Sequence, residues 1–77
     1  MKQIDIKELI PFMKNGWVAM DEDGSWFWCE IKPEIKNCNI WELNKPCSYC
    51  TLTEYVDIKP VSDWTKSLIK VENDNAR

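Results

Sequence analysis

The sequence predicts an α+β domain in which an N-terminal helix packs on a small antiparallel sheet of three to four strands, followed by a short C-terminal helical turn. Three observations indicate this fold. Apolar residues recur at helical spacing in residues 5–15, apolar runs flank a turn at residues 21–24, and apolar residues alternate in residues 51–59. With 77 residues, the chain has the length of one small domain. We assign residues 1–71 to this single domain and expect residues 72–77 to fray.

The N-terminal helix is predicted from its cap and its apolar stripe. Asp5 can accept the N-cap hydrogen bond, and Glu8 follows three residues later in a capping-box arrangement. The residues that would face the sheet share helical spacing: Ile6, Leu9, Ile10 and Met13. Pro11 has no backbone N–H and crowds the preceding turn, so we expect a kink or a restart at residues 10–11. Gly16 should end the helix in the left-handed conformation that glycine adopts readily.

A β-hairpin is predicted next, with one strand over residues 17–20 and the return strand over residues 25–31. Gly24 in the intervening turn accepts the positive φ that a tight turn needs. The return strand places its residues alternately on two faces: Trp26, Trp28 and Glu30 on one, and Phe27, Cys29 and Ile31 on the other. Both faces are apolar at their centre. We expect Trp17 to lie across from Trp26 and on the same face.

The remaining predicted elements are shorter. Residues 34–39 and 44–50 are polar and are predicted as loops. Residues 40–43 are predicted as a short strand, and residues 51–59 as a longer one because apolar and polar side chains alternate there. A helical turn with a serine cap is predicted over residues 62–69.

Composition and charge argue against several classes of partner. The net charge of −3 and the pI near 4.8 argue against nucleic acid, which requires a basic face. No apolar run approaches the ~18 residues of a membrane span, so no membrane partner is expected. Residues 1–5 lack the apolar core of a signal peptide, and we therefore expect a cytoplasmic protein with reduced thiols.

Four cysteines occur with the spacing C-x8-C-x8-C-x2-C: Cys29, Cys38, Cys47 and Cys50. A structural zinc site uses four ligands on two short knuckles, and only the pair Cys47 and Cys50 has knuckle spacing. Cys29 is expected on an apolar sheet face, where a thiolate is disfavoured. A glutaredoxin-like role for the Cys47-Ser48-Tyr49-Cys50 motif would need a helix after it, and a strand is predicted there instead. We expect no metal and no cofactor, and keep a small zinc-stabilised domain as an alternative.

The sequence contains no recognisable catalytic constellation. It has no histidine, which removes the commonest general base and the usual activator of a serine or cysteine nucleophile. The acidic residues at 21–24 suit a turn, since the third side-chain ligand and the distal glutamate of an EF-hand are missing. We therefore expect that the protein is not an enzyme.

The tryptophans are the best candidates for binding. The chain has five Trp residues, and flat rings on one sheet face can stack on sugars, nucleobases or a partner's side chains. The predicted binding residues combine such rings with nearby polar groups: Trp17, Trp26, Trp28, Glu30 and Tyr55. We expect a homo-oligomer or a protein partner on this aromatic face, because so short a chain cannot cover both faces. The alternatives are burial of the rings in the core and binding of a small molecule such as a nucleotide or a sugar.

Several short motifs follow one another in a recognisable order. They are Lys14-x-Gly16, the hairpin W-x3-D-x-D-G-x-W-x-W from Trp17 to Trp28, Lys32-Pro33, an isolated Trp41, and P-x2-D-W-x2-S-L from Pro60 to Leu68. This order resembles small phage- and prophage-encoded proteins of uncharacterised function. The resemblance implies a small α+β domain of mobile-element origin and implies no reaction. A fainter resemblance to phage anti-defence proteins that sequester nucleotide signals implies small-molecule binding.

Overall fold

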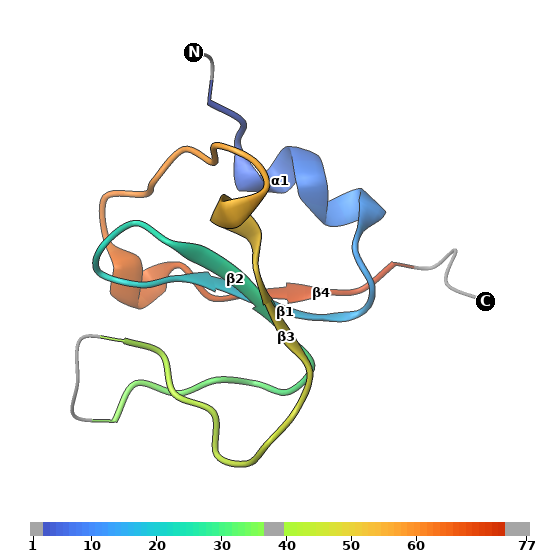
Figure 1. Cartoon of the computed structure of the whole chain (residues 1–77), viewed down its shortest axis with the longest axis vertical. Coiled ribbons are helices and arrows are strands. Elements are labelled where there is room, and N and C mark those ends of the chain that lie inside the picture. Colours follow the sequence, from blue (N-terminus) through green and yellow to red (C-terminus); the bar gives the residue numbers. More distant parts are fainter. Residues whose placement is uncertain (1–2, 37–39, 74–77) are drawn as a thin grey trace.

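The computed structural model describes residues 3–36 and 40–73. Its centre is one four-stranded antiparallel sheet with the strand order β3-β2-β1-β4. Figure 1 shows α1 above the strands and the long segment that joins β2 to β3 below them. The elements in chain order are α1 (Ile6–Leu9), η1 (Ile10–Phe12), β1 (Gly16–Met20), β2 (Trp26–Cys29), β3 (Tyr49–Thr51), η2 (Leu52–Glu54), η3 (Trp64–Lys66) and β4 (Ile69–Val71), where η denotes a 3₁₀ helix. The predicted α+β fold is confirmed.

Helix α1 is one turn long because Pro11 interrupts it. Asp5 caps the helix as predicted, and its carboxylate accepts a hydrogen bond from the Lys7 amide at 2.9 Å. The chain then tightens into η1, where Pro11 occupies a first-turn position that needs no N–H donor. The expected restart at residues 10–11 is confirmed. Ile6 is the buried residue of α1 and joins the core.

The β1–β2 hairpin turns at Gly24, as predicted. Its register ends with Met20 opposite Trp26. The Gly24 amide donates to the Asp21 carbonyl, and the Asp21 amide donates to the Ser25 carbonyl, both at 2.9 Å. Gly24 has φ 92°, a left-handed conformation that side chains other than glycine rarely adopt.

Gly16 has a different role from the predicted helix stop. It begins β1, and among the described residues only Gly24 has a positive φ. A Cβ atom on Gly16 would stand 2.6 Å from the Cys29 carbonyl oxygen and 2.7 Å from Trp28 Nε1. The Trp28 indole also donates to the Lys14 carbonyl at 3.1 Å. Glycine is therefore needed here for the close approach of an aromatic ring to the backbone.

Strand β3 lies where a loop was predicted. The predicted loop over residues 44–50 ends in β3, which pairs antiparallel with β2. The predicted strand over residues 51–59 contributes only its first residue to β3, and η2 follows at once. Further along, Ile58 forms an isolated parallel bridge with Ile4. The alternating apolar residues of this segment therefore pack beneath the helix and do not form a continuous strand.

The segment between β2 and β3 contains no strand within its described residues 30–36 and 40–48. The predicted strand over residues 40–43 is reduced to one isolated antiparallel bridge between Glu34 and Glu42. Two backbone hydrogen bonds of 2.8 and 2.7 Å hold this pair together. The bridge folds the segment back on itself below the sheet.

The predicted helical turn over residues 62–69 divides into η3 and the beginning of β4. The cap of η3 is Asp63, whose carboxylate accepts from the Thr65 amide at 3.0 Å, rather than the expected Ser62. Strand β4 pairs antiparallel with β1 and forms one edge of the sheet. The sequence pattern did not predict this strand.

At the end of β1 that β4 does not reach, the Ser67 side chain takes the place of a pairing strand. The Ser67 side chain is buried, and its hydroxyl oxygen accepts a hydrogen bond from the Met20 amide at 2.8 Å. The hydroxyl lies 2.6 Å from the Trp64 carbonyl, to which it donates. A side chain thus takes the place of a strand backbone at this end of β1.

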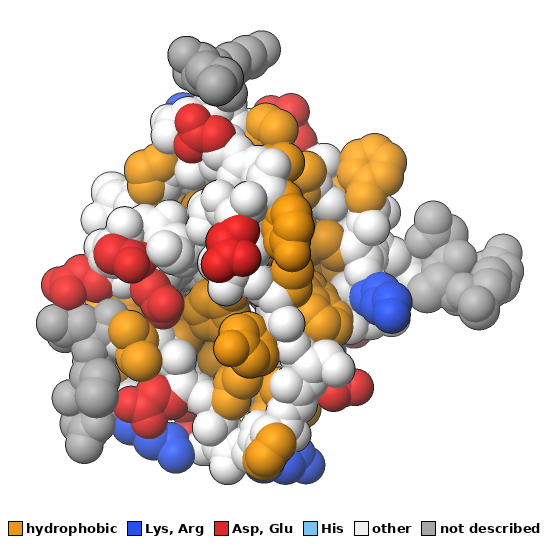
Figure 2. Space-filling view, in the orientation of Figure 1, with side chains coloured by type: hydrophobic (Ala, Val, Ile, Leu, Met, Phe, Trp, Pro, Cys, Tyr) orange, Lys and Arg blue, Asp and Glu red, His pale blue; other side chains and the backbone are white. Residues whose placement is uncertain are grey.

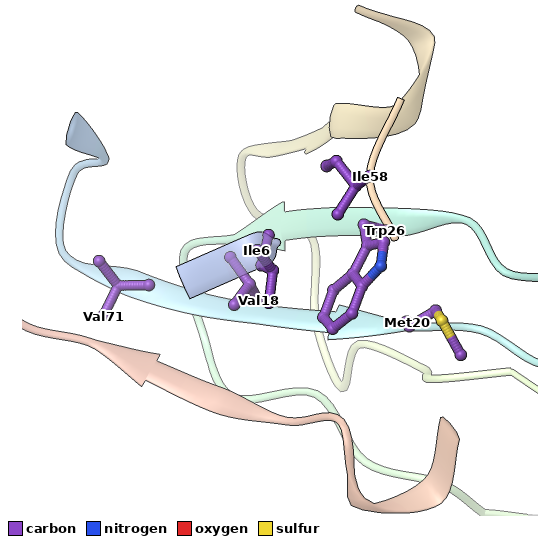
Figure 3. Close-up of a cluster of buried hydrophobic side chains, with 6 residues drawn as sticks. All are labelled: Ile6, Val18, Met20, Trp26, Ile58 and Val71. Atoms are coloured by element: carbon purple, nitrogen blue, oxygen red, sulfur yellow. The ribbon is translucent and has the colours of Figure 1, made fainter. Parts of the chain in front are cut away.

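The hydrophobic core lies between α1 and one face of the sheet. Figure 3 shows the six buried side chains of the core: Ile6, Val18, Met20, Trp26, Ile58 and Val71. Trp26 is 0% exposed and projects from β2 toward Ile58, and its indole N–H donates to the Lys59 carbonyl at 3.2 Å. The largest side chain of the core is therefore buried with its polar atom satisfied.

The chain after β4 is attached to the end of the helix. The Asn73 side-chain amide donates to the Ile10 carbonyl at 3.1 Å and to the Met13 carbonyl at 2.5 Å. The Asn73 backbone amide donates to the Asn15 side chain at 2.8 Å. Asn73 lies within the tail that is predicted to fray, residues 72–77, and residues 74–77 lie outside the described part of the chain.

Candidate binding cleft

The strand register places the three tryptophans that were predicted to share one face of the sheet on two opposite faces. We call the face covered by α1 the inner face and the opposite one the outer face. Trp26 and Trp28 lie on the inner face, with Met20 and Val18 as their partners on β1. Trp17 is paired with Cys29 and therefore lies on the outer face, contrary to the prediction. No single sheet face carries all three rings.

Two of the five predicted binding residues are unsuited to contact a ligand on the sheet. Trp26 is completely buried in the core. Tyr55 is 76% exposed but follows η2, away from the strands. Glu30 is exposed just after β2, where its amide donates to the Ser48 carbonyl at 3.0 Å. The structure does not bring the predicted set of residues together.

Trp17 and Trp28 are partly exposed but have protein neighbours. The ammonium groups of Lys32 and Lys70 lie 5.7 and 5.8 Å from the centre of the Trp17 ring, within the range of cation–π contacts. Trp28 lines a small apolar cavity of about 180 Å³ with Met13, Lys14, Cys50 and Leu52. Both rings therefore have a structural role.

A cleft lies on the outer face of the sheet. It has a volume of about 500 Å³ and lies between β2–β3 and the segment that joins them. We call it the outer cleft, and its lining residues are Asp21, Ser25, Phe27, Ile40, Trp41, Glu42, Leu43, Tyr49 and Thr51. Figure 2, in the orientation of Figure 1, shows hydrophobic side chains gathered near the middle of the visible surface, with acidic side chains among and around them. This volume falls in the range of ligand pockets, roughly 300–1,000 Å³.

Three aromatic rings give the outer cleft its walls. Phe27 projects from β2 and Tyr49 from β3, because the pairing of Ala19 with Phe27 and of Cys29 with Tyr49 places them on the outer face. Tyr49 is 66% exposed. Trp41 contributes to the lining from the β2–β3 segment.

Trp41 is held in place by the hairpin. Its indole N–H donates to the Met20 carbonyl at 3.0 Å, and its backbone amide donates to the Asp21 carboxylate at 3.0 Å. The ring of Trp64 packs against it edge-to-face, with 6.4 Å between the ring centres and 90° between the planes. The position of Trp41 is therefore fixed by contacts with the hairpin and with η3.

Two carboxylates line the outer cleft. The pKa of Asp21 is raised above its usual value by burial, the hydrogen bond from the Trp41 amide opposes this rise, and the nearby charge of Asp23 adds to it. Glu42 is paired directly with Glu34 in the isolated bridge. Like charges opposite one another repel, so the backbone bridge holds these acids together against their repulsion.

The cysteines are divided between the two faces of the sheet. Cys29 is completely buried on the outer face, and burial together with the neighbouring Cys47 raises the pKa of its thiol to about 11. Cys50 is paired with Trp28 and lies on the inner face. Within residues 3–36 and 40–73, no three His, Cys, Asp or Glu side chains gather as metal ligands would. Cys38 lies outside the described residues.

A third cavity of about 480 Å³ lies between the start of α1 and the segment around η3. Its charged lining residues are of both signs: Asp5, Lys7, Asp63 and Lys66. Asp63 is a helix cap, and the hydrogen bond from the Thr65 side chain holds the pKa of its carboxyl below the usual value. This mixture of charges gives the cavity no preference for one sign of ligand.

Comparison of the chain with known protein families, with curated proteins and with solved structures gives no match. Within the described part of the chain, no helix has the length and apolar character that crossing a membrane requires.

Sequence reasoning missed the outer cleft because its residues come from segments with no regular pattern. Phe27 was placed on the correct face, opposite Trp26 and Trp28. Trp41 and Tyr49 were placed in separate short elements, and nothing local indicates that they meet. The one available signal was the isolated Trp41, since a tryptophan side chain is highly buried on average.

Proposed function

We propose that this protein is a non-enzymatic binding module, of the type of small phage and prophage proteins, and that its ligand occupies the outer cleft. The observation that carries the proposal is an open cleft of about 500 Å³ in which aromatic rings and carboxylates converge. Ligand sites commonly combine apolar walls with a few polar groups that fix orientation. The outer cleft has this composition, whereas the small cavity beside Trp28 is almost wholly apolar.

Because Trp26 is buried, binding is proposed on the outer face and not on the sheet face that contains Trp26. Self-association through a face that contains Trp26 would require that α1 separates from the sheet, because Trp26 belongs to the core beneath it. The exposed aromatic surface lies instead on the outer face, where Tyr49 is 66% exposed. The absence of histidine from the chain supports a binding role over a catalytic one.

Two exposed tyrosines provide a matched test of this site. Tyr49 lines the outer cleft and is 66% exposed, whereas Tyr55 lies outside it and is 76% exposed. Amide chemical shifts should be recorded while the protein is titrated with a panel of amino acids, amines, sugars, nucleotides and short peptides. A ligand should shift the signals of Phe27, Trp41 and Tyr49 first.

The variants then test whether the site is the functional one. Tyr49→Ala should abolish or weaken the shifts, and Tyr55→Ala should leave them unchanged, because only the first removes a wall of the cleft. The proposal fails if no compound of the panel shifts the cleft signals. It also fails if ligands shift Trp17 or Tyr55 instead. Sedimentation at the same concentrations shows whether a second copy of the chain occupies the cleft.

A further inference from the structure

We propose that the outer cleft binds a cationic group, an ammonium or a guanidinium, between its aromatic walls and its carboxylates. This inference rests on the proposed function, because it names the class of ligand for the same cleft.

The lining carries charge of only one sign. Asp21 and Glu42 contribute carboxylates, and none of the described residues that line the cleft is basic. Glu34 lies directly across from Glu42 in the isolated bridge and adds a third negative charge beside the cleft. A cation would relieve the repulsion among these acids. A phosphate group would meet only like charge, which argues against a nucleotide here.

The aromatic walls suit the same ligand. The faces of Phe, Tyr and Trp rings attract a cation within about 6 Å of the ring centre. Trp41 is held in one orientation by its hydrogen bonds to Met20 and Asp21 and by its edge-to-face contact with Trp64. A cation in the cleft beside Trp41 would therefore meet a ring that needs no rearrangement on binding.

Trp17, another aromatic residue on the outer face, already has cationic neighbours within the chain. Its ring is already contacted by two ammonium groups, those of Lys32 and Lys70, at 5.7 and 5.8 Å. No lysine or arginine is among the described residues of the cleft, although aromatic and acidic residues line it. The cleft thus has the partners for a cation and lacks an internal one.

The burial of Asp21 is consistent with this ligand. Its carboxylate accepts a hydrogen bond from the Trp41 amide, and burial disfavours its ionised form. A bound cation would compensate for the water that this carboxylate has lost. The two sources of such a group are the arginine or lysine side chain of a protein partner and a free organic cation.

The test compares a cation with its neutral isostere. N-acetyl-arginine methylamide and N-acetyl-citrulline methylamide have nearly the same shape, and only the first carries a charge. Both should be titrated into the full chain while the amide signals of Phe27, Trp41 and Tyr49 are followed. We expect the arginine compound to bind at least about tenfold more tightly, the ratio that 1.4 kcal/mol of binding free energy gives.

Two charge variants locate the interaction. Glu42→Gln removes a carboxylate from the cleft, and Glu30→Gln removes one from an exposed position outside it. The first should weaken binding of the arginine compound several-fold, and the second should leave it unchanged. Asp21→Asn is a second cleft variant, in which the amide oxygen can still accept from the Trp41 N–H.

A second titration arm distinguishes the two sources of the cation. A glycine pentapeptide with a central arginine should bind more tightly than tetramethylammonium if the partner is a protein, and more weakly if the ligand is a free organic cation. The inference is overturned if the citrulline compound, a sugar or an acidic compound shifts the cleft signals as strongly as the arginine compound. That result would leave the binding function in place. Failure of every compound at the cleft would overturn both.

Discussion

The indole of Trp28 lies against the backbone of Gly16, so closely that a Cβ atom on Gly16 would stand 2.7 Å from Trp28 Nε1. This contact joins the first residue of β1 to the adjacent strand and closes the open end of the hairpin. The indole N–H is satisfied at the same time by the Lys14 carbonyl. An aromatic ring over a glycine on a neighbouring strand compensates for the side chain that glycine lacks.

Gly16→Ala should destabilise the domain by about 1–3 kcal/mol, because the added methyl group has no space beside Trp28 and the Cys29 carbonyl. Chemical denaturation measures the loss. The same substitution in a Trp28→Ala background should cost less, since one of the two obstacles is gone. Equal costs in the two backgrounds would contradict the contact between these residues.

Gly24→Val should destabilise the domain by more than about 1 kcal/mol, because a β-branched residue adopts φ 92° poorly. No atom lies within 4 Å of a Cβ at this position, so the cost is conformational rather than steric. Gly24→Asn is the matched variant and should cost less, since asparagine enters the left-handed region more readily. If both variants have the same denaturation midpoint as the wild type, residue 24 does not have the positive φ that the structure shows.

Ser67→Ala should cost about 1–3 kcal/mol of unfolding free energy, because it leaves the buried Met20 amide without its hydrogen-bond acceptor. Ser62→Ala, at an exposed position nearby, should change stability by less than about 0.5 kcal/mol. Hydrogen exchange of the Met20 amide gives an independent readout. Exchange that stays as slow in Ser67→Ala as in the wild type would show that another group protects this amide.

The stability of the domain should fall as the pH rises from about 9 to about 11. The pKa of Cys29 is raised by burial from its ordinary value of 9.0 to about 11, so its neutral thiol is favoured in the folded state. A group with a raised folded pKa contributes its full stability below the unfolded pKa and loses it as the pH passes the folded pKa. The loss should be on the order of 2 kcal/mol, since one pKa unit corresponds to about 1.4 kcal/mol. Denaturation curves between pH 8 and pH 11 measure it.

Cys29→Ala provides the control for this pH dependence, because it removes the thiol and leaves the other titrating groups in place. The slope of unfolding free energy against pH should be smaller in this variant than in the wild type. The buried Cys29 should also react with alkylating reagents more slowly than the partly exposed Cys47 and Cys50. Identical slopes in both proteins would mean that Cys29 is not the group responsible.

The parts of the fold that were predicted correctly are those encoded by neighbouring residues. The Asp5 cap, the break at Pro11 and the turn at Gly24 each depend on one residue type in one local conformation. The face of Trp17 was predicted wrongly because it depends on register. A shift of one residue in the pairing moves every side chain of a strand to the opposite face.

The strands that were missed are three residues long. Strands β3 and β4 are too short to show a period of two, and each is defined by its partner rather than by its own sequence. The outer cleft was missed for a related reason. The bond from the Trp41 indole to the Met20 carbonyl joins residues 21 positions apart, and only the folded chain reveals it.

Because Asn73 bonds to the end of the helix, the domain cannot complete its folding until residue 73 has been synthesised. The β1–β2 hairpin uses contacts between near neighbours, whereas Asn73 reaches Asn15 across 58 positions of the chain. Until β4 has left the ribosome, one edge of β1 has no strand to pair with, and the Met20 amide has no Ser67. Until then the nascent chain presents an open strand edge, the form in which small sheet proteins are most exposed to aggregation and to chaperones.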